Sequence, residues 1–302
     1  MQINQLASAI RKGNRVALAK GITLAENDVA SASILLGRIG VPGQAFVVGI
    51  TGPPGTGKSS LVDRLIEVYR NRGLKVGVIA VDPTSPITGG ALLGDRIRMA
   101  GHAGDRNVFI RSMASRGWSG GLSRATSQVI RLMDAAGFDL ILLETVGIGQ
   151  SDIEVVGVSH AVLVVLMPGL GDDIQVSKAG LMEIGDVYVV NKSDLDGADV
   201  MVVSLLSLFR GGPRSPPVLK VSALSGDGID RLEEAIERIR IPFTIGGTDL
   251  KLKSIRGMIV ETARGAAMQK LAVVSESRAD SLARQVLEGK TTVEAAAAKL
   301  SG

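Results

Sequence analysis

Residues 52–59 combine glycines, a lysine and a serine at the spacing of a phosphate-binding loop. The stretch matches the pattern Gly-x-x-x-x-Gly-Lys-Ser. Glycines let the backbone curl with its N–H groups facing a phosphate, and a helix N-terminus adds partial positive charge. We expect the β- and γ-phosphates to be neutralised by Lys58 and Mg²⁺ to be bound by the Ser59 hydroxyl. The predicted loop comprises Gly52, Pro53, Pro54, Gly55, Thr56, Gly57, Lys58, Ser59 and Ser60.

The segments on either side of this loop give it the required context. Residues 46–50 form an apolar run that is typical of a buried strand. After the loop, apolar residues recur at the spacing of one helix face, at Leu61, Val62, Leu65, Ile66 and Tyr69. A glycine turn before an ordinary helix is the alternative, but strand, loop and helix in this order favour phosphate binding.

Two carboxylates follow apolar runs where a nucleotide site would need them. Asp82 ends one predicted strand and Glu144 ends another, with Gly147 three residues later. An acid at such a position holds Mg²⁺, and the glycine N–H can meet a γ-phosphate. Asp95 lies in the glycine-rich stretch 88–99 and is a further candidate, although an acid at a helix N-terminus is the competing interpretation. The predicted metal set is Ser59, Asp82, Asp95 and Glu144.

Residues 191–194, Asn-Lys-Ser-Asp, follow a predicted strand and form a guanine-reading pattern. The Asp194 carboxylate can accept hydrogen bonds from both N1–H and the N2 amino group of guanine, a donor pair that adenine lacks. We expect Asn191 to tie this loop to the phosphate loop and the Lys192 stem to cover the base. The next strand end, at Ser222, Ala223 and Leu224, would supply a backbone contact to guanine O6.

A second glycine-rich stretch, residues 168–178, follows a predicted strand at the same edge. Segments of this kind can be ordered by a γ-phosphate and released on hydrolysis. Ile148 stands after Gly147 and cannot orient a water, so we expect slow intrinsic hydrolysis. Lys178 could supply a catalytic cation when a partner fixes its loop, and a solvated helix lysine is an equal alternative. The catalytic candidates are therefore Lys58, Asp95, Glu144 and Lys178.

Between residues 46 and 222, short aliphatic runs alternate with helical patterns. The runs lie at 46–50, 76–81, 108–110, 140–143, 161–167, 187–190 and 218–221. This alternation predicts an α/β fold with a mostly parallel sheet covered by helices on both faces. After the helix that follows the phosphate loop, a short connection at Arg72-Gly73 leads into the next strand, which predicts a parallel βαβ unit. Ras-like GTPases have an antiparallel strand at this point, so that subclass is not favoured.

Helical patterns flank this region on both sides. We expect a helical extension at 1–42, a nucleotide-binding domain at 43–242 and a helical arm at 243–302. The arm carries a long stripe of apolar and small residues between Leu252 and Ala267. The stripe fits either a dimerisation surface or helices packed on their own domain.

Composition excludes several classes of protein. The 302 residues include no cysteine and only two histidines, so neither a disulfide nor a nickel-delivery site rich in these ligands is expected. Both histidines, His102 and His160, are more often structural at such positions, and packing is slightly favoured for Trp118. The net charge of +4 without a basic run gives no indication of nucleic-acid binding. No run of eighteen apolar residues and no signal-peptide core occur, so we expect a cytoplasmic protein without a membrane segment.

These motifs together resemble the MeaB/ArgK family of SIMIBI-class P-loop GTPases, which includes the human methylmalonic aciduria type A protein. The resemblance rests on VDPTSP (81–86), GGALLGDRIRM (89–99), FIRS (109–112), GWSGG (117–121), ETVGIGQSD (144–152), PGLGDDIQ (168–175), NKSD (191–194) and SAL (222–224). It covers essentially the whole chain. Arg96-Ile97 stand where relatives tend to have Lys-Thr, and the loop after Gln175 also departs from the family pattern.

The resemblance implies a GTPase that binds GTP or GDP with Mg²⁺ and chaperones an adenosylcobalamin-dependent mutase, usually methylmalonyl-CoA mutase. It also implies a homodimer joined through C-terminal helices, and metal-site acids at Asp82, Asp95 and Glu144. Some family members carry a label as kinases of a transport system. A phosphotransferase is therefore the alternative function.

Overall fold

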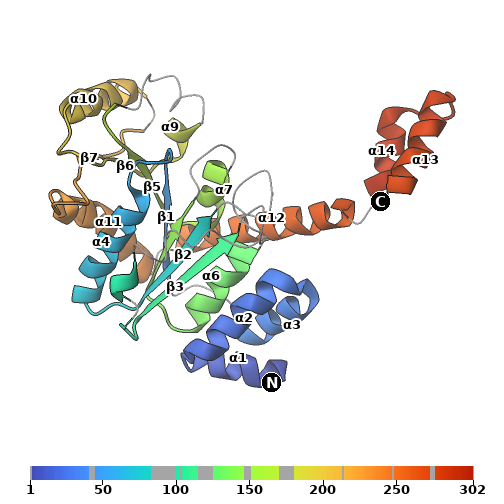
Figure 1. Cartoon of the computed structure of the whole chain (residues 1–302), viewed down its shortest axis with the longest axis horizontal. Helices are drawn as coiled ribbons and strands as arrows, with labels where there is room; N and C mark the ends of the chain where they lie inside the picture. The colour runs from blue at the N-terminus through green and yellow to red at the C-terminus, as the bar shows by residue number, and fades with distance from the viewer. Residues whose placement is uncertain are drawn as a thin grey trace. The chain divides into compact units, whose positions relative to one another are not determined.

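A parallel sheet lies at the core of the unit formed by Met1–Met258 (Figure 1). In the computed structural model, the described residues are 2–40, 45–82, 99–102, 104–114, 125–145, 151–169, 180–212, 214–246, 248–272 and 276–301. Within them the sheet has seven strands in the order β3-β2-β4-β1-β5-β6-β7, and every neighbouring pair is parallel. The predicted α/β fold with a parallel sheet is confirmed.

The strands coincide with the aliphatic runs in the sequence. They are β1 (Phe46–Thr51), β2 (Val76–Asp82), β3 (Val108–Ala114), β4 (Leu140–Glu144), β5 (Ala161–Leu166), β6 (Val187–Val190) and β7 (Val218–Lys220). Successive side chains of a strand point to opposite faces, so both faces need apolar residues where helices cover both. In β1, Val47 joins the core on one face, and Phe46 and Val48 join the core on the other.

Different helices cover the two faces (Figure 1). Helices α4 (Lys58–Asn71) and α11 (Ile229–Thr244) pack on the face of Phe46 and Val48. The opposite face is covered by α6 (Ala125–Ala135), α7 (Ser151–Val158), α9 (Leu181–Ile184) and α10 (Ala198–Phe209). The short 3₁₀ turn η1 (Ala100–His102) precedes β3.

The three N-terminal helices add to the core on the face of the sheet that carries Val47 and α6. They are α1 (Ile3–Arg11), α2 (Arg15–Asn27) and α3 (Val29–Ile39), and they pack against one another and against α6. Helix α3 begins after Asp28, whose side chain accepts a hydrogen bond from the Ser31 N–H and caps the helix. Ile22 and Leu132 lie in the shared core.

The C-terminal region is helical, with α12 (Thr248–Ala272), α13 (Glu276–Leu287) and α14 (Val293–Ser301). By its internal contacts the chain divides into two units, Met1–Met258 and Ile259–Gly302. In the second unit α13 packs on α14, and Arg278 donates a hydrogen bond to the carbonyl of Lys299. Among the helices that the structure describes, none has the length and apolarity needed to cross a bilayer.

His160 is a structural residue at the start of β5. Its Nδ1 accepts a hydrogen bond of 2.8 Å from the Val47 N–H, and its ring lies 5.4 Å from the ring of Phe46 and 4.2 Å from that of Phe243. Burial, with a smaller contribution from the charges of Lys253 and Lys251, lowers the pKa of His160 to about 4. The folded chain therefore holds this imidazole neutral at pH 7.

We predict that the free energy of unfolding falls as the pH drops from 6.5 toward 4. The unfolded chain binds a proton at His160 near pH 6.5, whereas the folded chain binds it only near pH 4. This site should contribute about 2 kcal/mol to the loss between pH 7 and pH 5. Urea unfolding at both pH values for wild type and His160→Asn, which keeps an acceptor for Val47, isolates the contribution. Equal losses in the two proteins would contradict it.

Candidate functional site

The glycine loop after β1 is shaped by close contacts that only glycine permits. Gly52 has φ of +139°, and a Cβ there would lie 2.0 Å from the Val165 carbonyl oxygen. Gly57 has φ of +85°, and a Cβ there would lie 2.5 Å from the Asn191 side-chain nitrogen. Helix α4 begins at the next residue, so the loop leads directly into a helix N-terminus, where backbone N–H groups are available to an anion.

Lys58 lies over the loop that it follows. Its Nζ donates hydrogen bonds to the carbonyl oxygens of Gly52 at 2.8 Å and Pro53 at 3.1 Å. The Thr56 hydroxyl donates to the same Pro53 carbonyl at 2.9 Å. Lys58 is only 7% exposed. These hydrogen bonds hold its buried ammonium group at the point where the loop curls. A phosphate entering the loop would meet this cation directly.

Ser59 and Glu144 meet below the loop. The Ser59 hydroxyl donates a buried hydrogen bond of 2.7 Å to Glu144 Oε1. The meeting follows from the sheet, because β1 and β4 are neighbours and Ile50 is in register with Glu144. The two predicted metal ligands from distant parts of the sequence are thus in contact, and both are oxygen donors of the kind that Mg²⁺ prefers.

Asn191 makes the link between loops that the sequence predicted. Its amide nitrogen donates to the carbonyl of Thr56 at 2.8 Å and of Gly57 at 3.4 Å. Its amide oxygen accepts a hydrogen bond of 3.0 Å from the Ala223 N–H. One buried side chain therefore connects the phosphate loop to the loops that follow β6 and β7.

Asp194 and Ser222 lie next to Asn191 and contact each other. The Ser222 hydroxyl donates a hydrogen bond of 2.6 Å to Asp194 Oδ1, and this bond lowers the pKa of Asp194 below its ordinary value. Asp194 is consequently an ionised acceptor at pH 7. Lys192 has φ of +56°, and among the described residues it is the only non-glycine with positive φ. Such a conformation stores strain and is frequent at functional sites.

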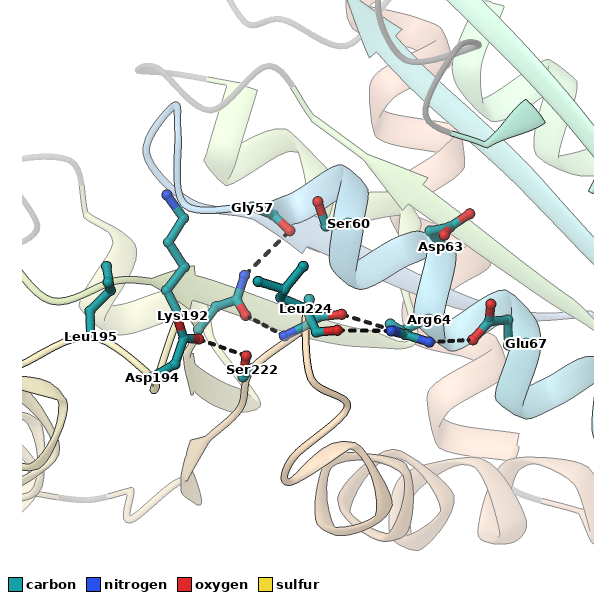
Figure 2. A pocket seen from close by; sticks show the side chains of 12 residues that line it. Gly57, Ser60, Asp63, Arg64, Glu67, Lys192, Asp194, Leu195, Ser222 and Leu224 are labelled. Carbon is teal, nitrogen blue, oxygen red and sulfur yellow. Dashed lines mark hydrogen bonds and ion pairs between the residues drawn. The ribbon is translucent and has the colours of Figure 1, made fainter. Parts of the chain in front are cut away.

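These residues line one cavity of about 670 Å³ (Figure 2). Its lining residues are Gly57, Ser60, Asp63, Arg64, Glu67, Asn191, Lys192, Asp194, Leu195, Ser222, Ala223 and Leu224. Leu224 is 83% exposed beside it, which offers an apolar surface to a planar base. The cavity thus combines an ionised acceptor, a cation and apolar walls next to the phosphate loop.

The sequence interpretation missed four of the lining residues. Asp63, Arg64 and Glu67 come from α4, and Leu195 comes from the loop after β6. A signal for the first group existed, because Ser60 and these three residues recur at intervals of three, one and three along the helix. That spacing makes one polar face opposite the buried face of Leu61 and Leu65.

Several predicted site residues are not placed by this geometry. Asp82 is the last residue of β2, whose Ala80 is in register with Glu144, so its backbone lies at the same sheet edge. Asp95, Gly147 and Lys178 lie outside the described residues, as does Trp118. Their roles stay predictions.

A family comparison decides which class of nucleotide-binding protein this is. The family described as "Methylmalonyl Co-A mutase-associated GTPase MeaB" matches residues 18–274. The chain belongs to the MeaB family. The match includes the phosphate loop, Glu144, the Asn191–Asp194 loop and the Ser222–Leu224 loop, so the resemblance found from the motifs is confirmed.

Individual relatives agree with this assignment. A putative GTPase of Pyrococcus horikoshii is 51% identical over 243 residues, which are 78% of this chain and 77% of the relative. The methylmalonic aciduria type A homolog of Mus musculus is 35% identical over 262 residues, 79% of this chain and 63% of the relative. The crystal structure of a LAO/AO transport system kinase is 26% identical, with a TM-score of 0.73 over 99% of this chain and 96% of that one.

Membership in the MeaB family makes this chain a P-loop GTPase that binds guanine nucleotides. The cavity between the phosphate loop and Asp194 is therefore the natural candidate for the guanosine part of the nucleotide. The family description associates the family with methylmalonyl-CoA mutase.

Proposed function

We propose that this MeaB-family GTPase chaperones an adenosylcobalamin-dependent mutase, foremost methylmalonyl-CoA mutase. In this role it gates cofactor loading and protects the mutase from inactivation. The family description and the name of the mouse relative support the identity of the partner. The choice of a guanine nucleotide is supported by the ionised Asp194 carboxylate, which accepts a hydrogen bond from Ser222 in a cavity that adjoins the phosphate loop.

The reaction is hydrolysis of GTP to GDP and phosphate. Lys58 would leave the carbonyls of Gly52 and Pro53 and neutralise the β- and γ-phosphates, while backbone N–H groups at the start of α4 orient the phosphate oxygens. Asp194 would accept from N1–H and the N2 amino group of guanine, the Lys192 stem would cover the base, and Asn191 would keep the two subsites at a fixed spacing.

Mg²⁺ fits the oxygen donors below the loop. Ser59 and Glu144 are in contact and Asp82 ends the neighbouring strand, so we propose these residues as its ligands, with Asp95 as a further one. When bound, the ion would supply positive charge that offsets the charge of the β- and γ-phosphates. Residues 52–60, Gly147, Asn191, Lys192, Asp194 and 222–224 remain our proposed nucleotide contacts.

We propose slow intrinsic hydrolysis that the mutase stimulates. Ile148 stands where a water-orienting side chain would be needed, and Lys178 is the only cation in the 168–178 stretch. A single ordered cation can supply about 10³- to 10⁵-fold in related phosphoryl-transfer sites. We further propose the domain limits 1–42, 43–242 and 243–302, with a homodimer through the last segment, where α12 exposes Leu252 and Ile259.

The Mg²⁺ assignment is tested with Ser59→Ala. Loss of the hydroxyl should lower Mg²⁺-dependent GTP hydrolysis at least about 10-fold, because one of the oxygen ligands is removed. Ser159→Ala is the matched control, since this serine is equally buried but lies at the opposite end of the strands. Hydrolysis rates should be measured over a Mg²⁺ titration. Identical titration curves for the two variants would remove Ser59 from the metal site.

The partner assignment is tested by adding methylmalonyl-CoA mutase to a GTP hydrolysis assay. The wild-type rate should rise at least about 10-fold. Lys178→Ala should keep the basal rate and lose most of the stimulation, whereas Lys12→Ala, at an exposed position in the turn between α1 and α2, should respond like wild type.

An unstimulated wild type would contradict the partner assignment, and a fully stimulated Lys178→Ala would contradict the role of that lysine. Phosphate recovered on a protein or small molecule, not in solution, would favour the phosphotransferase alternative. Light scattering of the free chain in the same preparation tests the dimer, which a monomeric mass would contradict.

A further inference from the structure

Arg64 connects the phosphate-loop helix to the loop that follows β7 (Figure 2). Its Nε donates to the Ala223 carbonyl at 2.9 Å and its Nη2 donates to the Leu224 carbonyl at 2.9 Å. Its Nη1 donates to Glu67, one turn along α4, also at 2.9 Å. All three arms of the guanidinium group are therefore engaged, and the side chain is held in one orientation.

The bond to Ala223 also sets the direction of the next N–H group. The described residues contain no cis peptide bond, so the peptide between Ala223 and Leu224 is trans, with its C=O and N–H on opposite sides. Because Arg64 holds the Ala223 carbonyl toward α4, the Leu224 N–H must point away from α4. In Figure 2 the side of Leu224 away from Arg64 is the side of Lys192 and Asp194.

The neighbouring amides in this loop are already engaged. The Ala223 N–H donates to Asn191 Oδ1 at 3.0 Å, and the Ser225 N–H donates to the Ser222 hydroxyl at 3.3 Å. For the Leu224 N–H, no acceptor lies within hydrogen-bond distance among the described residues. This amide is consequently the donor that the loop can offer to a ligand in the cavity.

We propose that Arg64 is a positioning residue for guanine specificity, and that it aims the Leu224 N–H at O6 of the base. The proposal rests on the guanine site described above. O6 is an acceptor, whereas adenine carries an amino donor at the same ring position, so a fixed N–H there favours guanine. Asp194 reads N1–H and the N2 amino group, which lie beside O6 on the same edge of the base, and analogues that change O6 or N2 alone separate the two contacts.

The test measures the affinities of GDP, 6-thio-GDP and IDP for the full chain by calorimetry. 6-Thio-GDP carries sulfur, a poor acceptor, in place of O6, and IDP lacks the N2 amino group. In wild type both analogues should bind more weakly than GDP. In Arg64→Met the GDP affinity should fall about 3- to 10-fold and the preference for GDP over 6-thio-GDP should nearly vanish. The preference for GDP over IDP should persist, because Asp194 is unchanged.

Two further variants separate positioning from general stability. Arg64→Lys can reach only one carbonyl and should keep part of the preference for O6, whereas Glu67→Gln leaves both carbonyl bonds in place and should keep nearly all of it. Equal weakening of all three nucleotides in Arg64→Met and Arg64→Lys would overturn the proposal, as would an unchanged preference for GDP over 6-thio-GDP. Failure of wild type to bind GDP at all would instead overturn the proposed function.

Discussion

The site depends on one buried amide, that of Asn191. It contacts the phosphate loop through the Thr56 carbonyl and the loop after β7 through the Ala223 N–H. Leaving either buried backbone group unpaired costs about 1–3 kcal/mol, so the three loops are stable together in one arrangement. Gly57 approaches the Asn191 side chain so closely that a Cβ at this position would clash with it. The second glycine of the phosphate-loop pattern is therefore needed for the Asn191 amide to reach the loop. The spacing between the phosphate loop and the loop after β7 is therefore set by the protein itself.

The parallel sheet places these loops at one edge. β1 lies between β4 and β5, while the helix after β1 covers one face and the helix after β4 covers the other. Ligands bind in open α/β sheets at the point where successive connections move to opposite faces. This topology brings Ser59 to Glu144 across 85 positions of sequence. At the opposite strand ends, the His160 ring packs against Phe46 and Phe243 and contributes to the core.

Local patterns predicted much of the molecule, because each has a cause within a few residues. Aliphatic runs predicted every strand that the structure describes, and the glycine spacing and the Asn191–Asp194 loop predicted residues on two sides of the cavity. What the sequence did not reveal depends on distant contacts. The hydrogen bond from Arg64 to the Ala223 carbonyl joins residues 159 positions apart, and the hydrogen bond from the Ala223 N–H to Asn191 joins residues 32 positions apart. The packing of the N-terminal helices on α6 likewise has no local signature.

We propose that Asp194 makes this cavity a guanine site. The most direct measurement is the affinity of wild type and Asp194→Asn for GDP and XDP, by calorimetry in the presence of Mg²⁺. Loss of the charged double acceptor should weaken GDP about 100-fold or more, and the new amide donor should favour xanthine, which has an oxygen where guanine has its N2 amino group. Wild type should show the opposite preference. Unchanged GDP affinity in Asp194→Asn would contradict the role of Asp194 in reading guanine.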